Sequence, residues 1–307
     1  MIAIGFDTSN YTTSIACFDG ADGVNCSRLL PVKQGELGLR QSDAVFSHTK
    51  SLPELSGRLF SHAEISSVDV IGVSTRPRAV EGSYMPCFMV GYSHAKLLAD
   101  AYGKPLVEVS HQQGHVAAAL WSAGRLDLMD QPHLAWHLSG GTTELLLVEP
   151  EGKNVRCTKI GGTTDISAGQ LIDRTGQLLE LPFPAGKHLD ALSQKASDKE
   201  VFRVKCPGLE FSLSGVQNKV QQYHEQKQIP AETAAYALRC VAYGVLKASQ
   251  NAMKAYPGLE IVFSGGVASN SMLRQVLAPL NPVFAQPQFS TDNAMGVAIL
   301  AHRLREE

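Results

Sequence analysis

The sequence predicts an α/β protein with two lobes of related topology. Strands are expected at residues 2–6 and 12–18, and again at 134–138 and 142–148, so that each pair forms a hairpin. Both hairpins carry a Thr-Thr pair just after the turn, which indicates a weak internal repeat. At 307 residues the chain is also longer than most chains that fold around a single hydrophobic core. Chance similarity of two hairpins is the alternative, and the pattern alone does not decide between them.

Hydrophobic periodicity places the other elements. Buried-type strands are expected at residues 69–74, 105–110 and 259–263. Helices are expected at residues 88–102, 116–121, 168–181, 231–255 and 270–277, across most of 187–228 apart from a break at 211–215, and from residue 290 to the end of the chain.

The central feature is the histidine pair His111-Gln-Gln-Gly-His115, which lies where a strand is followed by a helix. Residues four apart share one face of a helix, and two neutral imidazoles on one face can bind a transition metal. The alternative is that one histidine caps the helix and the other faces solvent. A third ligand would have to come from elsewhere, and Asp292 is a candidate. Asp292 could instead be a helix N-cap or first-turn acid.

A second candidate site is the glycine turn Ser264-Gly265-Gly266-Val267, between a strand and a helix. Glycines at such a junction let backbone N–H groups approach an anion, so the turn suits a phosphate or ribose. An ordinary tight turn is the alternative.

Composition restricts the function classes. The content of 44% hydrophobic and 18% charged residues is typical of a soluble globular protein, and no apolar run is long enough to cross a membrane or to form a signal peptide. We therefore expect a cytoplasmic protein with no membrane contact. The six cysteines include no CxxC pair, which argues against a zinc knuckle or a disulfide framework. Because the net charge is only -2, contact with RNA would need a local basic patch or a partner protein.

Taken together, the motifs resemble the tRNA threonylcarbamoyladenosine transferase family (TsaD), also called the glycoprotease or O-sialoglycoprotein endopeptidase family. The similarity covers nearly the whole chain and keeps the motif order. The motifs are His111-x-x-x-His115, Ser139-Gly140-Gly141, Gly169 to Asp173, Phe211-Ser212-Leu213-Ser214-Gly215, Gly265-Gly266-Val267, Asn270 and Thr291-Asp292-Asn293.

The resemblance implies the two-lobed ATPase fold of actin, hexokinase and heat-shock chaperones, with duplicated ribonuclease-H-like lobes. We expect an N-terminal lobe of residues 1–108 with 293–307, and a C-terminal lobe of residues 109–292 that carries the metal and nucleotide motifs. The active site would lie in the cleft between the lobes.

The resemblance also implies the site residues and ligands. His111, His115 and Asp292 would hold one divalent metal, for which iron or zinc suits the mixed nitrogen and oxygen ligands. ATP or an acyl-adenylate would be the bound ligand. Its binding residues would be Ser139, Gly140, Gly141, Asp173, Gly186, Asp190, Gly265, Gly266 and Asn270. Asp190 could alternatively be an exposed helix residue.

The family reaction transfers a threonylcarbamoyl group from threonylcarbamoyl-adenylate to an adenosine next to the tRNA anticodon. Three departures from the family pattern mark this chain as a divergent member or paralogue. The first turn has Asn10-Tyr11-Thr12 in place of an acidic pair, which leaves Asp7 as a weak candidate for the catalytic base. Thr142 replaces a histidine after Ser139-Gly140-Gly141, and the loop at residues 76–85 lacks the family's glycine- and proline-rich character.

The first hypothesis is therefore a metal-dependent threonylcarbamoyl transferase acting on tRNA with family partner subunits, in a heterodimer with a related protein. The alternatives are a non-catalytic regulatory nucleotide-binding paralogue, and another carbamoyl transferase, kinase or ATPase of the superfamily. Peptidase activity is disfavoured, because an HExxH metallopeptidase needs a glutamate base where this chain has Gln112.

Overall fold

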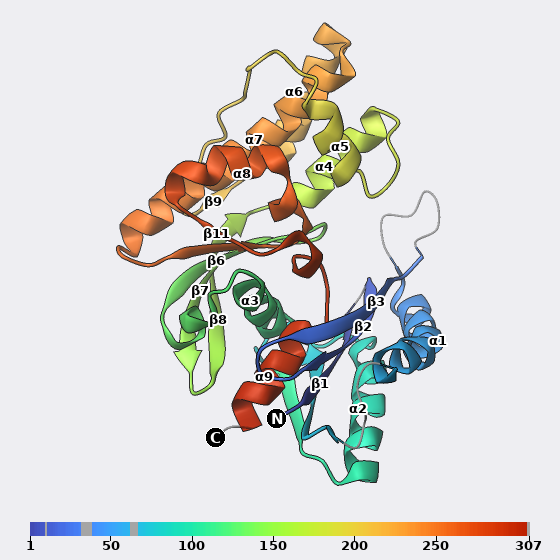
Figure 1. Cartoon of the computed structure of the whole chain (residues 1–307). Coiled ribbons are helices and arrows are strands. Elements are labelled where there is room, and N and C mark those ends of the chain that lie inside the picture. Colours follow the sequence, from blue (N-terminus) through green and yellow to red (C-terminus); the bar gives the residue numbers. More distant parts are fainter. Residues whose placement is uncertain (10, 32–38, 62–66, 306–307) are drawn as a thin grey trace. The chain divides into compact units, whose positions relative to one another are not determined.

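The computed structural model describes residues 1–9, 11–31, 39–61 and 67–305 (Figure 1). The chain divides into two compact units. The first comprises Met1–Gln131, Glu149–Cys157 and Asp292–Glu307, and the second comprises Pro132–Val148 and Thr158–Thr291.

These units differ from the expected lobes in one important respect. The helix that begins at His111 belongs to the first unit, as does Asp292, whereas both were expected in the C-terminal lobe. The physical reason is that this helix packs along the C-terminal helix, which itself lies on the N-terminal sheet. The expectation that the active site lies between the lobes stays a prediction.

The sheet of the first unit has the strand order β3-β2-β1-β4-β5. β1 runs antiparallel to β2, and β2 antiparallel to β3, whereas β1 is parallel to β4, and β4 to β5. The strand bounds are β1 Ala3–Ser9, β2 Thr12–Phe18, β3 Gly23–Leu29, β4 Val70–Arg76 and β5 Leu106–Ser110.

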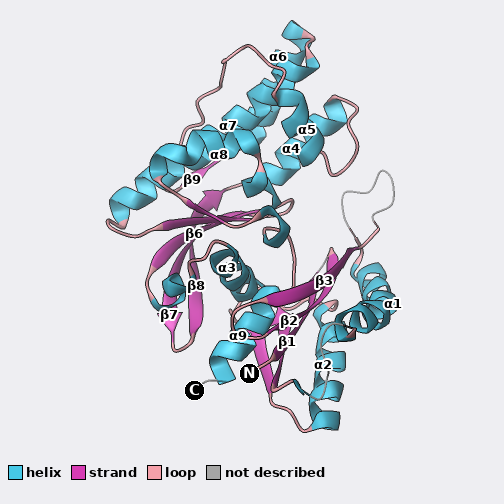
Figure 2. Ribbon diagram, in the orientation of Figure 1, coloured by secondary structure: helices cyan, strands magenta, loops and turns pink. Residues whose placement is uncertain are grey.

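Helices cover both faces of this sheet (Figure 2). They are α1 Gln41–Phe60, α2 Phe88–Tyr102, α3 His111–Ser122 and α9 Met295–Arg305. Because side chains alternate along a strand, Ile4 and Phe6 of β1 join the apolar core beneath α1 and α2, and Gly5 faces α9. A Cβ at Gly5 would lie 2.5 Å from the backbone nitrogen of Ala298, so only glycine permits α9 to pack so closely.

The sheet of the second unit has the order β11-β10-β6-β7-β8-β9. Its first five strands repeat the order of the first unit: β6 is antiparallel to β7 and parallel to β10, which is parallel to β11. The bounds are β6 His133–Leu138, β7 Thr143–Glu151, β8 Asn154–Thr163, β9 Glu210–Phe211, β10 Ile261–Ser264 and β11 Val283–Phe284. The repeated topology confirms the predicted α/β fold with duplicated lobes.

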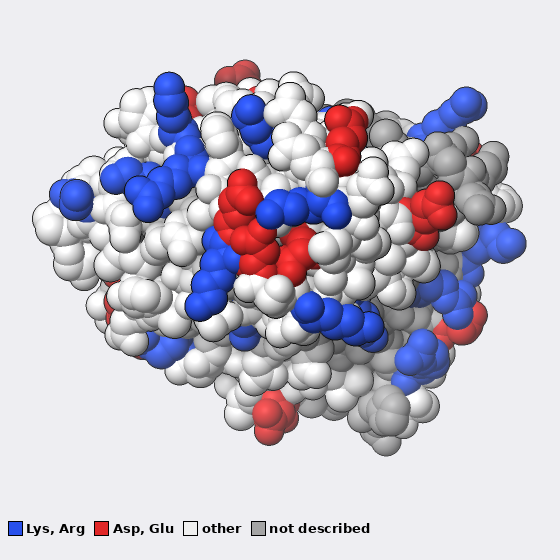
Figure 3. Space-filling model, turned by 90° about the horizontal axis from the view of Figure 1, so that it is seen from above, with Lys and Arg blue, Asp and Glu red and all other residues white. Residues whose placement is uncertain are grey.

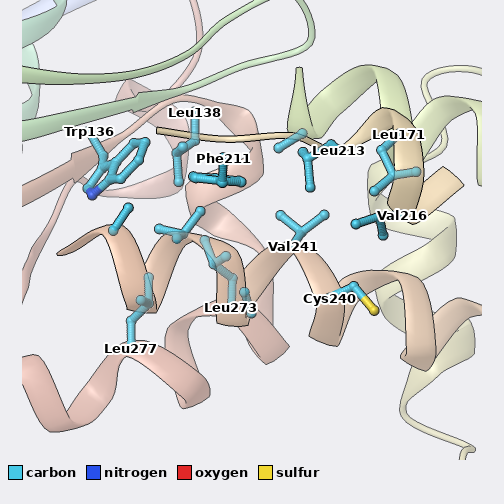
Figure 4. Close-up of a cluster of buried hydrophobic side chains, with 14 of the residues drawn as sticks. Trp136, Leu138, Leu171, Phe211, Leu213, Val216, Cys240, Val241, Leu273 and Leu277 are labelled. Carbon is cyan, nitrogen blue, oxygen red and sulfur yellow. The ribbon is translucent and has the colours of Figure 1, made fainter. Parts of the chain in front are cut away.

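The helices of the second unit enclose a large apolar core. They are α4 Ala168–Leu178, α5 Gly186–Ser193, α6 Ser214–Lys227, α7 Pro230–Ala255 and α8 Ser271–Leu277. Figure 4 shows Leu213 next to Val241 of α7 in this core, with Phe211 between Leu213 and Trp136. The one polar atom of the Trp136 ring is satisfied, because Nε1 donates to Ser249 Oγ at 2.8 Å.

Several segments differ from the sequence prediction. The last helix begins at Met295 and not at residue 290, and α1, β3 and β8 were not predicted. Residues 7–9 continue β1 instead of forming a turn. Residues 194–209 are not helical although a mostly helical stretch was expected. There, side chains of α7 satisfy the backbone in place of helical hydrogen bonds: Glu232 accepts the N–H of Ser197, and Asn251 donates to the carbonyl of Gly208.

None of the helices among the described residues is both long and apolar enough to cross a bilayer.

Candidate metal centre and nucleotide-binding turns

Helix α3 presents His111 and His115 on one face because they are four residues apart, and a capping box determines where the helix begins. Ser110 is the N-cap: its hydroxyl accepts the N–H of Gln113, and the Gln113 side chain accepts the N–H of Ser110 at 2.9 Å. The helix therefore begins at His111, and His115 is 6% exposed. The alternative in which one histidine caps the helix and the other faces solvent is wrong.

Asp292 approaches the histidine pair because two glycines allow α9 and α3 to pack tightly. A Cβ at Gly296 of α9 would lie 1.8 Å from the carbonyl oxygen of Gly114, the residue that precedes His115. Asp292 Oδ1 consequently lies 3.2 Å from His115 Nε2 and 3.5 Å from His111 Nε2. Asp292 precedes α9 without capping it.

The three donor atoms fit a metal ion. The two Nε2 atoms are 2.9 Å apart, and Asp292 Oδ1 completes a triangle with sides of 3.2 and 3.5 Å. Ligands at about 2.1 Å from a common ion and separated by these distances would subtend angles of roughly 87° to 113°. That range spans the octahedral and tetrahedral values. Two histidines and one carboxylate on one side of an ion are also the ligand set of many iron enzymes.

A second carboxylate orients the first histidine. Asp7 Oδ2 lies 2.6 Å from His111 Nδ1, and Asp7 Oδ1 accepts the N–H of Ser9 at 2.9 Å. The Asp7 side chain is nearly fully buried. A proton held on Nδ1 by Asp7 leaves Nε2 of His111 free to bind a metal.

The electrostatics of this cluster favour a cation. Burial lowers the pKa of His111, but the charge of Asp7 and the hydrogen bonds with Asp292 and Asp7 outweigh it and raise this pKa to about 10. Burial and the charge of His111 lower the pKa of His115. Burial opposes ionisation of Asp292, yet hydrogen bonds from His111 and His115 hold its pKa well below the ordinary value. A metal ion among the donor atoms would replace the positive charge that the His111 proton supplies.

The first turn contributes no other acid. Asn10 lies outside the described residues. Tyr11 is half-buried and its carbonyl accepts the N–H of Leu30, and Thr12 is buried in β2. The weak candidate base, Asp7, has one oxygen engaged by His111 and the other by a backbone N–H.

In the second unit, the two glycine turns lie side by side. The Ser139-Gly140-Gly141 turn follows β6, and Gly265-Gly266 follows β10, which pairs in parallel with β6. A Cβ at Gly265 would lie 2.1 Å from the carbonyl oxygen of Leu138, and Gly265 has φ +92, so this position requires glycine. Both turns therefore open at the carboxyl ends of adjacent parallel strands, where α/β proteins bind ligands.

The packing of the protein does not require glycine at the Ser139-Gly140-Gly141 turn. A Cβ at Gly140 or at Gly141 would meet no atom within 4 Å. The turn itself is held firmly, because Ser139 Oγ accepts the N–H of Thr142 and the Gly140 carbonyl accepts the Ser167 hydroxyl at 2.6 Å. The exposed glycines thus leave space through which a ligand can approach the backbone.

The other nucleotide candidates have structural partners as well. Asp173 accepts the N–H of Ala185, next to Gly186, and burial raises its pKa. Asp190 binds Ser271 through both carboxylate oxygens, so it connects α5 to α8 and is not merely a solvent-facing residue. Asn270 is the N-cap of α8 and accepts the N–H of Leu273 at 3.0 Å.

Sequence reasoning missed Asp165. Its carboxylate accepts the hydroxyls of Ser212 and Ser214 and the N–H groups of Leu213 and Ser214, and thereby holds the 211–215 motif against the start of α4. Burial opposes ionisation, but the two serine hydroxyls and the backbone N–H groups lower the pKa of Asp165 to about 2. No sequence spacing links Asp165 to a motif more than 40 residues away.

The repeated sheet topology defines the class of fold, which solved structures of HypF and of a hexokinase share. HypF of T. kodakarensis aligns with 99% of this chain and 47% of its own, at 14% identity and a TM-score of 0.66. The ROK hexokinase of Thermus thermophilus covers 100% of both chains at 15% identity and a TM-score of 0.56. These similarities establish the fold.

Sequence similarity identifies the family. The tRNA N6-adenosine threonylcarbamoyltransferase of Thermosipho africanus is 31% identical over 325 residues, which span 99% of this chain and 94% of that protein. The enzyme of the same name from Archaeoglobus fulgidus is 28% identical over 90% of this chain and 81% of its own. The family described as TsaD, tRNA N6-adenosine threonylcarbamoyltransferase, matches residues 36–299. The chain belongs to this transferase family, which confirms the resemblance and the prediction of a transferase.

Proposed function

We propose that this chain transfers a threonylcarbamoyl group from threonylcarbamoyl-adenylate to the N6 amine of an adenosine next to the tRNA anticodon, and that the transfer depends on a bound divalent metal. Family membership supports the reaction class. The observation that carries the metal dependence is the convergence of His111 Nε2, His115 Nε2 and Asp292 Oδ1.

Iron or zinc suits these ligands best, because imidazole nitrogen with one carboxylate oxygen favours such metals over calcium. When bound, the ion would polarise a phosphate or carbonyl oxygen of the acyl-adenylate. His111 and His115 would hold it from one helix face, and Asp7 would keep His111 in the tautomer that presents Nε2.

The glycine turns of the second unit would bind the nucleotide part of the donor. Backbone N–H groups of Gly140 and Gly141 can approach phosphate oxygens because no side chain blocks them. Asp173, which has one carboxylate oxygen bound to the Ala185 N–H, could accept a ribose hydroxyl with the other.

In the reaction, the adenosine amine forms a bond to the carbamoyl carbon, the bond from that carbon to the phosphate oxygen breaks, and AMP leaves. The amine also loses a proton. Asp7 is a poor acceptor for this proton, since both of its oxygens already accept hydrogen bonds and it is buried. The transfer would therefore need a base other than Asp7.

One observation favours a second candidate function. Because the first turn offers no free carboxylate among the described residues, the chain could instead be a nucleotide-binding subunit that pairs with a related protein and regulates it. A heterodimer with a family relative is part of both proposals.

The test compares the anaerobically purified wild type with a His111→Ala/His115→Ala variant. Metal content, binding of ATP, and threonylcarbamoylation of tRNA in the presence of family partner subunits are measured. The transferase proposal expects about one metal per chain and tRNA modification in the wild type, with both lost in the variant. Nucleotide binding without metal or turnover in either protein would instead support the regulatory subunit.

A further inference from the structure

The charge of the protein restricts where RNA could bind. The net charge is -2, so electrostatic attraction to RNA must come from a local surface. On the face shown in Figure 3, lysines and arginines are interspersed with aspartates and glutamates in the centre, and several lie together at the upper left. The first unit offers a further candidate surface, which lies beside the metal cluster.

The candidate surface is built on residues 76–87, which connect β4 to α2 and which we call the arginine loop. It is anchored to the start of α3, because the carbonyl of Pro77 accepts the N–H of Gln112, the neighbour of His111. Its other end is held by the Gln41 side chain, which accepts the N–H of Cys87 at 3.3 Å. The loop therefore has a defined position at the edge of the candidate metal centre.

Exposed arginines gather around this loop. Arg76 and Arg78 are exposed, and so is Arg40, which directly precedes Gln41. Among the residues described, neither Arg40 nor Arg76 is paired with a carboxylate. Glu81 is the one acidic residue of the loop, so residues 76–87, with Arg76 and Arg78, carry a net charge of +1.

An exposed aromatic ring lies within the same loop. Tyr84 is 64% exposed, and the turn that precedes it is stabilised by two hydrogen bonds: Ser83 N–H donates to the Val80 carbonyl, and Arg78 N–H donates to Ser83 Oγ. An ordered loop holds a side chain ready at low entropic cost. Arginines that contact phosphates and an aromatic ring that stacks on an unpaired base are how proteins bind single-stranded RNA loops.

We propose that the arginine loop docks the anticodon loop of the tRNA. Arg40, Arg76 and Arg78 contact its phosphates, and Tyr84 stacks on an unpaired base, which places the neighbouring adenosine near His111. This inference rests on the proposed function, since it names the surface that receives the acceptor RNA.

The test measures direct binding of an anticodon stem-loop RNA to the full chain with its partner subunits, without the acyl donor. Arg76→Ala/Arg78→Ala should weaken binding. In a plot of the logarithm of the affinity against the logarithm of the salt concentration, the slope should become less steep by roughly one unit for each lost phosphate contact. Tyr84→Ala should weaken binding roughly 5- to 150-fold, which corresponds to the loss of one stacked base. Metal content should stay at the wild-type level in both variants.

Matched controls come from the same unit. Arg28→Ala/Arg156→Ala removes two exposed arginines that pair with Glu54 and Glu149, and Tyr102→Ala removes a half-exposed tyrosine at the far end of α2. Both controls should bind the RNA as the wild type does. If loop and control variants lose affinity equally, the attraction is non-specific and the proposal is overturned.

The experiments can reject the docking proposal and the transferase proposal independently of each other. Loop-dependent RNA binding in a protein that never modifies tRNA would retain the docking surface and reject the transferase. Modification of tRNA with unchanged binding by the loop variants would retain the transferase and reject the docking surface. Loss of a partner subunit from the loop variants would identify the loop as a protein contact, and this too would overturn the proposal.

Discussion

Asp7 Oδ2 and His111 Nδ1 lie 2.6 Å apart, although 104 residues separate them in the sequence. Asp7 is buried in β1. Because its carboxylate contacts Nδ1 of His111, the other ring nitrogen, Nε2, faces Asp292 and His115. We therefore expect Asp7, a weak candidate for the base, to act instead by positioning His111.

Asp7→Ala should lower metal affinity about 10- to 100-fold, because His111 would lose the partner that sets its tautomer and ring orientation. Asp7→Asn should lower it less, since the amide oxygen can still accept from Nδ1–H without supplying the charge. Metal affinity is measured by competition with a chelator of known affinity. Equal affinities in all three proteins would show that Asp7 does not act through His111.

Gly296→Ala should destabilise the protein by about 1–3 kcal/mol and weaken metal binding, because the added Cβ would overlap the backbone of Gly114 and push α9 from α3. Gly57→Ala is the matched control. Gly57 lies inside α1, where a Cβ meets nothing within 4 Å, so that variant should be more stable by about 0.5–1 kcal/mol. Denaturant unfolding measures both changes. If Gly296→Ala is as stable as the wild type, the close packing of α9 against α3 does not depend on glycine at this position.

Gly140→Ala and Gly141→Ala should leave the free energy of unfolding unchanged within about 0.5 kcal/mol, since neither added Cβ meets a protein atom. Both should weaken ATP binding, because the methyl group would occupy the space through which phosphate approaches the backbone. Calorimetric titration with ATP, together with thermal unfolding, separates the two effects. Unchanged ATP affinity would remove this turn from the candidate site.

Asp165 should contribute stability that depends on pH. Its pKa is about 2 in the folded protein, against an ordinary value of 3.8. A lowered folded pKa stabilises the native state above pH 4, and this contribution is lost as the pH falls toward 2. Because Asp165 is exposed, the effect should be below about 1 kcal/mol.

The measurement for Asp165 is the difference in unfolding free energy between the wild type and Asp165→Asn at several pH values. The variant should be less stable at pH 6, and the difference should shrink between pH 4 and pH 2. A difference that does not change with pH would mean that the carboxylate charge contributes nothing at this position.

Much of the fold could be predicted because it depends on local patterns. The strands at 12–18 and 134–138 and the helix at 88–102 follow from hydrophobic periodicity, and the structure contains β2, β6 and α2 there. The stretch at 194–209 was mispredicted because its backbone is satisfied by Glu232 and Asn251 of a distant helix, which no local pattern reveals.

The sequence by itself determined the α/β fold, the family, and the histidine pair on one helix. Periodicity and each short motif are patterns of residues near one another in the chain, and the order of the motifs can be read along it without knowledge of their contacts. Tertiary structure alone decided that Asp292 meets this pair, that Asp7 orients His111, and that Asp165 holds the 211–215 motif. Each of these contacts joins segments distant in sequence, and one of them depends on whether two glycines let α3 and α9 approach closely. Such proximity is a consequence of packing, which the order of residues specifies only through the complete fold.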